Sequence, residues 1–237
     1  MLWVTPGIPR RVPGASLNRM SKAPTVPRLP KFPELVTTGF GDLTALEVDG
    51  RSEGLLFDSD DGAGLDLEDT AFTECVFKRV GLQGAELQRA SFGDCRFEEL
   101  NAPSLQAAGS VWWNTELRRT RIGSAELHGA SIRSTLFDGG KLGYVNLRSA
   151  KLKDVVFRDV IIEELDLGSA QLERVSFPGC RIDSLIVNGS KLKHADLRGI
   201  TLRSVTGISG LRGATIDEMQ LADLAPILAA EAGLLLG

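Results

Sequence analysis

The stretch from Ala71 to Leu100 reads "AFTECVFKRVGLQGAELQRASFGDCRFEEL" and carries one large apolar residue every five positions. These residues are Phe72, Phe77, Leu82, Leu87, Phe92 and Phe97. The same frame runs unbroken from Leu67 to Leu202, where all 28 positions spaced by five are apolar. The position two places before each of them carries no charge, so two of every five residues are suited to a buried environment.

A period of five excludes the two common amphipathic elements. In a helix, a step of five residues turns the side chain by about 140°, so no apolar stripe forms. In a straight strand, an odd period alternates between the two faces. A strand that bends every five residues satisfies the pattern, because the paired positions point inward and the chain turns before the next pair. The pattern therefore predicts a solenoid of stacked coils.

Phenylalanines indicate how many sides each coil has. They recur at multiples of twenty residues, which predicts four five-residue sides per coil and like residues stacked on each wall. The expected structural core contains Phe77, Phe97, Phe137, Phe157 and Phe177. The 28 units predict about seven coils, which at the ~4.8 Å spacing of neighbouring strands give a rod roughly 34 Å long.

Several units, including "GAELQ", "SAELH", "YVNLR" and "HADLR", resemble the A-(D/N)-L-x-x units of the pentapeptide repeat family. The resemblance covers about 140 residues. It implies a bacterial protein with the all-β, right-handed quadrilateral β-helix of that family. It implies no single function, because one repeat fold serves many roles.

The frame divides the chain into four segments. Residues 1–33 are rich in proline and arginine and are expected to be disordered, with Met20 as an alternative start. Residues 34–64 are expected to be an irregular lead-in, in which Leu55 and Phe57 are candidates for the start of the first coil, and residues 65–206 the β-helix. Residues 207–237 are expected to complete a last partial coil, in which the frame slips by one residue, and then to form a helical cap that Pro226 breaks or kinks into two short helices. This cap either covers the last coil only or also forms a homodimer, as in some gyrase-binding members of the resembled family.

Nothing in the sequence points to catalysis. No nucleophile, P-loop or metal motif is present, and the acidic segment at residues 58–69 departs from calcium-binding loops, so we expect no enzyme activity, cofactor, metal site or small-molecule substrate. Cys75 and Cys95 are twenty residues apart and should stack in the core, with Cys180 on another wall. Three cysteines, a net charge of −4 and no long apolar run favour the cytoplasm and no membrane contact.

Charge is unevenly distributed along the predicted rod. Residues 42–99 carry 15 acidic and 5 basic side chains, whereas residues 116–206 carry 11 acidic and 15 basic ones. A candidate partner-binding surface lies beyond the middle and contains Trp113, Arg133, Lys151, Lys153, Lys191 and Lys193. For Trp113, packing on a neighbouring corner is the alternative.

Three functions fit this surface. The first is a binding scaffold for an unknown protein. The second is a DNA mimic that binds gyrase, as quinolone-resistance members of the resembled family do. The third is nucleic-acid binding along the basic residues.

Overall fold

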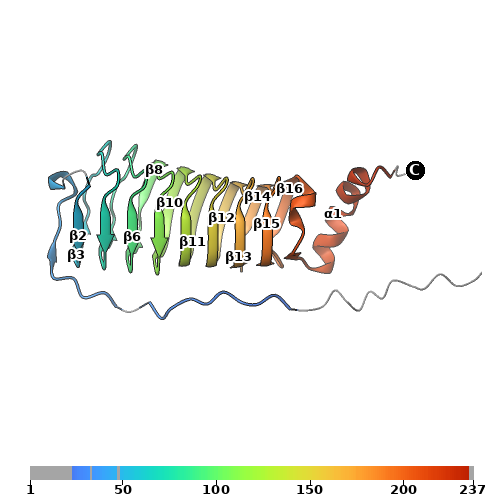
Figure 1. The fold of residues 1–237 in the computed structure, drawn as a ribbon, viewed down its shortest axis with the longest axis horizontal. Coiled ribbons are helices and arrows are strands. Elements are labelled where there is room, and N and C mark those ends of the chain that lie inside the picture. The colour runs from blue at the N-terminus through green and yellow to red at the C-terminus, as the bar shows by residue number, and fades with distance from the viewer. Residues whose placement is uncertain (1–22, 33, 47–48, 235–237) are drawn as a thin grey trace, which may run out of the picture.

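The computed structural model describes residues 23–32, 34–46 and 49–234. These residues form a β-solenoid of about nine turns, closed at its C-terminal end by one helix (Figure 1). The strands are β1 (Gly39–Phe40), β2 (Arg51–Glu53), β3 (Leu55–Asp58), β4 (Ala71–Thr73), β5 (Val76–Lys78), β6 (Ser91–Gly93), β7 (Arg96–Glu98), β8 (Asn101–Gln106), β9 (Val111–Trp113), β10 (Glu116–Glu126), β11 (Ser131–Asn146), β12 (Lys151–Asp166), β13 (Gln171–Ser176), β14 (Arg181–Ile186), β15 (Lys191–Asp196), β16 (Thr201–Thr206) and β17 (Ala214–Thr215).

The strands pair in parallel with a constant offset. Every ladder from β2 to β16 joins residues twenty apart, for example Leu117 to Phe137 and Phe137 to Phe157. The last ladder pairs Ala195 with Ala214, an offset of nineteen, which confirms the expected one-residue slip. The twenty-residue coil predicted from the sequence is therefore the repeating unit of the fold.

The core is filled by the frame that the sequence defines. Phe77, Phe97, Phe157 and Phe177 are at most 2% exposed, and Phe137 is 7% exposed. Their rings stack along one wall, with centroids 4.4 Å apart for Phe77 and Phe97 and 4.5 Å apart for Phe137 and Phe157. The near-parallel rings repeat at about the spacing of neighbouring strands, so the strand ladder sets their separation.

The corners of the coil require left-handed backbone. One corner, two residues beyond a core position, has φ between 51° and 65° in eight successive turns. Its residues are Gly54, Glu74, Asp94, Asn114, Ser134, Asp154, Arg174 and His194. We call this row the strap edge. Side chains other than glycine tolerate this conformation at a cost of about 1–2 kcal/mol each, which the surrounding ladders must offset.

The regular coil starts earlier than the sequence analysis placed it. The expected number of seven coils is too low, because β2 and β3, inside the expected lead-in at 34–64, already pair twenty residues ahead with β4 and β5. Phe57 occupies the core and is fully buried. The polar segment that follows, residues 58–61, obscured this first turn in the sequence.

Both ends of the rod are covered. At the N-terminal end, Gly41 lies directly against the ring of Phe57, and Leu43 of the 3-10 helix Leu43–Ala45 is buried. At the C-terminal end, a 3-10 turn (Ile208–Leu211) leads to helix α1 (Glu218–Glu231).

Helix α1 is anchored on the last coil through its first turn. Asp217 and Gln220 cap the helix reciprocally. The Gln220 amide also donates hydrogen bonds to the carbonyl oxygens of Leu197 (2.6 Å) and Ile200 (2.9 Å). Of the two effects expected of Pro226, a break into two helices is wrong, since α1 continues through it. Proline removes one backbone hydrogen bond, and the turns on either side remain helical.

Residues 23–32 and 34–38 run as an extended segment along the outside of the rod, from the region of β15 back to β1 (Figure 1). We call this segment the strap. The sequence analysis expected disorder over residues 1–33, but residues 23–32 have defined contacts with the coils. Residues 1–22, with the alternative start at Met20, lie outside the described residues.

Candidate functional site

The structure brings the predicted basic residues onto one wall. Strand pairing aligns Trp113, Arg133, Lys153 and Lys193 in one column, and Lys151 and Lys191 in the column beside it. We call these six residues the basic wall. Neighbouring members of a column lie one or two coils apart, so the charges repeat at about 4.8 or 9.6 Å.

One acidic residue interrupts the basic wall. Glu173 lies between Lys153 and Lys193 in the same column, and its carboxylate is 3.8 Å and 3.6 Å from their ammonium nitrogens. Arg174 also pairs with Glu173, and this contact, followed by the two lysines, holds the pKa of Glu173 below its usual value. Among the described residues, Lys151 and Lys191 form no ion pair, which leaves their charge available to a partner.

Trp113 is only half exposed. Its ring lies over Gly93 in the preceding coil, where a Cβ atom on Gly93 would approach the ring carbons to 1.8 Å. The ring therefore takes the space that a side chain at position 93 would fill. Packing on the neighbouring coil, the alternative raised by the sequence, describes Trp113 in this structure, and it forms a flat apolar end to the basic wall.

Two ion pairs near the strap were missed by the sequence analysis. Arg96 pairs with Glu116 at 3.1 Å, and Arg174 pairs with Asp154 at 2.6 Å. All four side chains are at most 12% exposed, although they occupy outward positions of the repeat. The sequence did contain a signal for these ion pairs, namely opposite charges twenty residues apart. Their burial depends on the strap, which the sequence analysis did not place.

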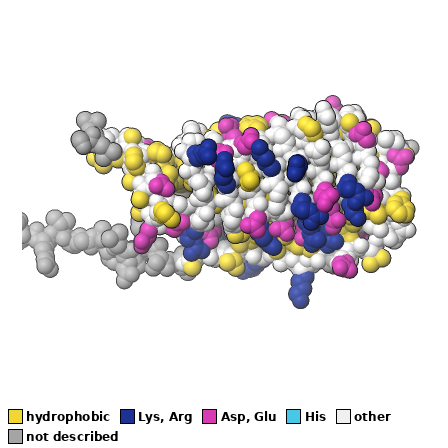
Figure 2. All heavy atoms as spheres, turned by 180° about the vertical axis from the view of Figure 1, so that it is seen from behind, with side chains coloured by type: hydrophobic (Ala, Val, Ile, Leu, Met, Phe, Trp, Pro, Cys, Tyr) yellow, Lys and Arg dark blue, Asp and Glu magenta, His cyan; other side chains and the backbone are white. Residues whose placement is uncertain are grey.

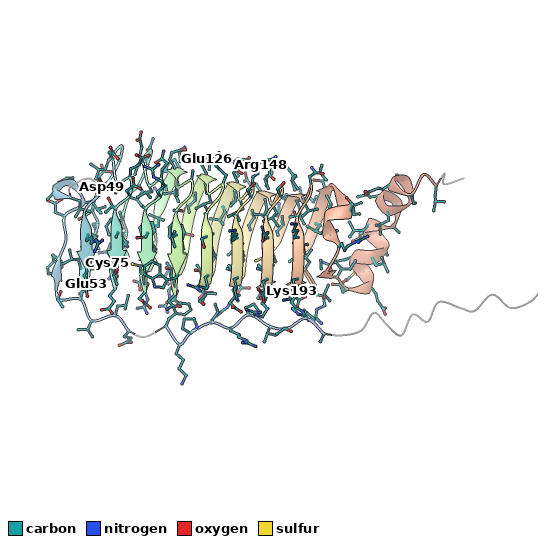
Figure 3. The ribbon with its side chains drawn as sticks, viewed as in Figure 1. Asp49, Glu53, Cys75, Glu126, Arg148 and Lys193 are labelled. Carbon is teal, nitrogen blue, oxygen red and sulfur yellow. The ribbon has the colours of Figure 1, made fainter. Side chains whose placement is uncertain are left out.

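The three cysteines lie in the core of the rod. All three cysteines are buried and free (Cys75 is labelled in Figure 3). Burial raises the pKa of the Cys95 thiol, and that of Cys180 to about 11. Thiols with raised pKa values are poor nucleophiles near neutral pH.

The acidic segment at residues 58–69 uses its carboxylates in local turns. Asp61 and Asp66 accept hydrogen bonds from the backbone amides of Ala63 and Glu68. Within the described part of the chain, no group of three or more histidine, cysteine or acidic residues is arranged to hold a metal ion.

The two histidines lie far apart. His128 lies 3.7 Å from Glu126, on the same edge of the rod as Arg148 (Figure 3). His194 contacts the strap and is next to Lys193. On the face shown in Figure 2, basic side chains lie among acidic ones, so this face does not carry a single sign of charge. No helix among the described residues is long and apolar enough to cross a bilayer.

Comparisons with known proteins find matches among solved structures. No protein-family model and no curated protein matches the sequence. A trypsin-treated form of QnrB1, a plasmid-mediated fluoroquinolone resistance protein, is 19% identical over 85% of this chain and 96% of its own, with a TM-score of 0.28. Full-length QnrB1 is 20% identical over 80% of this chain and 96% of its own, with a TM-score of 0.28.

A further match is HetL, a pentapeptide repeat protein involved in heterocyst differentiation regulation in the cyanobacterium Nostoc sp. strain PCC 7120. It is 18% identical over 70% of this chain and 91% of its own, with a TM-score of 0.24. At these low TM-scores, the fold assignment rests on the strand register of this chain. The chain is a β-solenoid of twenty-residue coils, and the structural relatives found for it are pentapeptide repeat proteins.

Proposed function

We propose that this chain is a non-catalytic binding protein, a rigid rod that offers its basic wall to an acidic surface of a protein partner. The observation that carries the proposal is the alignment of five basic residues in two adjacent columns beside the half-buried Trp113. Charges fixed at regular spacing favour a partner with matching acidic positions, because electrostatic complementarity selects partners and orients them.

The backbone supports this role. Within the solenoid, each coil is hydrogen-bonded to the coil before and the coil after it, so the columns do not shift relative to one another. A preorganised surface loses little conformational freedom when a partner binds. The wall residues themselves are long, flexible and exposed, which suits contacts at the rim of an interface.

Affinity capture from the native cytosol tests this proposal. Lys151→Glu combined with Lys191→Glu reverses the charge of the wall at two residues that form no ion pair with the described part of the chain. Arg121→Glu combined with Lys141→Glu makes the same change in net charge on another wall and is the matched control. We expect a stoichiometric partner that the wild type and the control retain and the wall variant loses. Equal capture by all three proteins contradicts the proposal.

A gyrase-binding DNA mimic is the second candidate function. The observation that favours it is the net charge of −10 over residues 42–99, since a mimic of DNA presents acidic side chains. The excess of bases over residues 116–206 opposes it. Inhibition of gyrase supercoiling at micromolar protein, relieved by added DNA, would favour this candidate, and its absence would exclude it.

The C-terminal cap is proposed as a homodimer contact. Helix α1 exposes Met219, Leu221, Ile227 and Leu228, and apolar side chains gathered on one element commonly mark an interface. Leu221→Glu should convert a dimer to a monomer in size-exclusion chromatography with light scattering. Ala222→Glu, at the neighbouring exposed position, should not. A wild-type protein that is monomeric at tens of micromolar excludes this contact.

A further inference from the structure

The strap has the features of a bound polyproline II segment. Pro24, Pro27, Pro30 and Pro33 recur every three residues, which is the period of the polyproline II helix. Pro24, Pro27 and Pro30 are partly buried against the rod, whereas Arg28 and Lys31 are exposed. The strap therefore presents one proline-bearing side to the coils.

The strap follows a single corner of the solenoid. The Thr38 amide donates to the Gly54 carbonyl (2.7 Å), and the Thr25 amide lies 3.4 Å from His194 Nδ1. Gly54 and His194 are the two ends of the strap edge, seven coils or roughly 34 Å apart. Thirteen residues of polyproline II cover about 40 Å, so the strap is extended over this whole distance.

A buried carboxylate accepts a hydrogen bond from the strap backbone near the middle of the strap. The Arg28 amide donates to Asp154 Oδ1 at 2.9 Å, and Asp154 is only 6% exposed. Arg174 fixes the same carboxylate through two nitrogen atoms, at 2.6 Å and 2.8 Å. This contact recognises a free backbone amide, which proline lacks, at one defined position of an otherwise proline-rich segment.

The strap leaves two hollows between itself and the coils. A hollow of about 380 Å³ lies between Pro24–Pro27 and the coil residues around Phe177, and Val26 is 72% exposed. Near the other end, Phe32 and Leu35 border a second hollow of about 50 Å³ beside Glu116. A segment with few buried side chains is held less firmly than the coils beneath it.

Both the strap and the strap edge carry charges of both signs. The strap carries Arg28, Lys31 and Glu34, and the strap edge carries Glu74, Asp94 and Asp154 together with Arg174 and His194. Arg174 pairs with Asp154, so Glu74 and Asp94 are the strap-edge carboxylates that favour a basic peptide. The pattern Pro-x-(Val/Ile)-Pro-Arg, read at Pro24–Arg28, also occurs at Pro6–Arg10, so the chain contains this ligand sequence twice.

We infer that the strap edge is a binding site for a basic, proline-rich extended peptide, that the strap fills this site in cis, and that a peptide of the same kind on another molecule can replace it. The strap edge adjoins the basic-wall column of Arg133, Lys153 and Lys193 but is made of different residues. The inference does not use Lys151 or Lys191, so its failure in the peptide-binding experiment is distinguishable from a failure of the proposed function in the capture experiment.

The experiment uses full-length protein and a labelled synthetic peptide of residues 23–35, followed by fluorescence anisotropy. Arg28→Pro in the protein keeps the strap suited to polyproline II and removes the amide that Asp154 accepts. Arg28→Ala removes the same positive charge and keeps the amide. Circular dichroism and thermal melting confirm that each protein is folded.

We expect the peptide to bind the Arg28→Pro protein at least tenfold more tightly than the wild type or Arg28→Ala, because its own strap competes less well. A peptide that itself carries Arg28→Pro should bind at least tenfold more weakly. In hydrogen exchange, excess peptide should speed exchange in the wild-type strap and leave the coils unchanged.

Two results would overturn the inference. One is a folded Arg28→Pro protein that does not bind the peptide at millimolar concentration. The other is equal binding of the wild-type peptide and the Arg28→Pro peptide, which would show that Asp154 does not bind the backbone amide.

Discussion

Asp154 and Arg174 lie one coil apart on the strap edge and form an ion pair through two nitrogen–oxygen contacts, with side chains 8% and 11% exposed. The pair joins two adjacent coils and, through the Arg28 amide, also holds the strap. A buried pair contributes little over an apolar replacement, but the loss of one partner leaves a charge without solvation.

Arg174→Leu should therefore destabilise the protein by about 2–4 kcal/mol in urea unfolding. Arg119→Leu, which removes an exposed partner of Glu99 in the same twenty-residue relationship, is the matched control and should have little effect. Equal losses in the two variants would show that the strap does not bury the Asp154–Arg174 pair.

The same pair predicts a dependence on pH. The hydrogen bond from Arg174 lowers the pKa of Asp154 below 3.8, so the carboxylate stabilises the fold above about pH 4 and loses this effect as the pH falls through its lowered pKa. The stability difference between wild type and Arg174→Leu should narrow below about pH 4. A difference that is constant from pH 7 to pH 3 would contradict this assignment.

The stacked phenylalanines should dominate core stability. Phe157 is 1% exposed and lies between Phe137 and Phe177, with ring centroids at 4.5 Å and 5.0 Å. Phe157→Ala should cost about 3–5 kcal/mol, and Phe157→Asp should prevent folding. Phe40→Ala is the control, because Phe40 is 83% exposed. Native circular dichroism for Phe157→Asp would contradict the core assignment.

Trp113 and Gly93 should be energetically coupled. Gly93→Ala places a methyl group where the Trp113 ring lies, so the ring must move outward. We expect a loss of stability and a red shift in tryptophan fluorescence. In the double variant Gly93→Ala with Trp113→Ala, the alanine at position 93 should cost much less. Additive effects of the two substitutions would show that they do not contact each other.

Gln220 should hold the C-terminal cap on the last coil. Gln220→Ala removes both donors to the carbonyls of Leu197 and Ile200, which should cost about 1–3 kcal/mol and speed hydrogen exchange in β16 and α1. Asp223→Ala, at an exposed position of α1, should leave exchange in β16 unchanged. Unaltered exchange in the Gln220 variant would show that other contacts hold the cap.

The repeating part of the fold could be predicted from the sequence because every coil repeats the same pattern of inward and outward residues. The positions of Leu67 through Leu202 specify both the inward face and the twenty-residue register, so the walls and the alignment of Lys151 with Lys191 follow directly. The first turn was only partly placed, because Leu55 and Phe57 fit its pattern but the acidic residues after Phe57 resemble a loop.

The parts that depend on contacts between distant segments were not predictable. The strap has no apolar periodicity of its own, and its course is set by Asp154, which is 126 residues away from Arg28 along the chain. The burial of Arg96 and Glu116 follows from the strap and was missed with it. Pro226 was expected on local grounds to break or kink the C-terminal helix, but its single lost hydrogen bond did not interrupt α1.

The most direct test of the central claim is the affinity of the captured partner for the purified protein, measured by titration calorimetry at two salt concentrations. We predict that Lys151→Glu with Lys191→Glu weakens binding at least tenfold and that Arg121→Glu with Lys141→Glu does not. Added salt should weaken binding of the wild-type protein. Equal affinities for the two double variants, or binding that salt does not affect, would contradict the assignment of the basic wall as the binding surface.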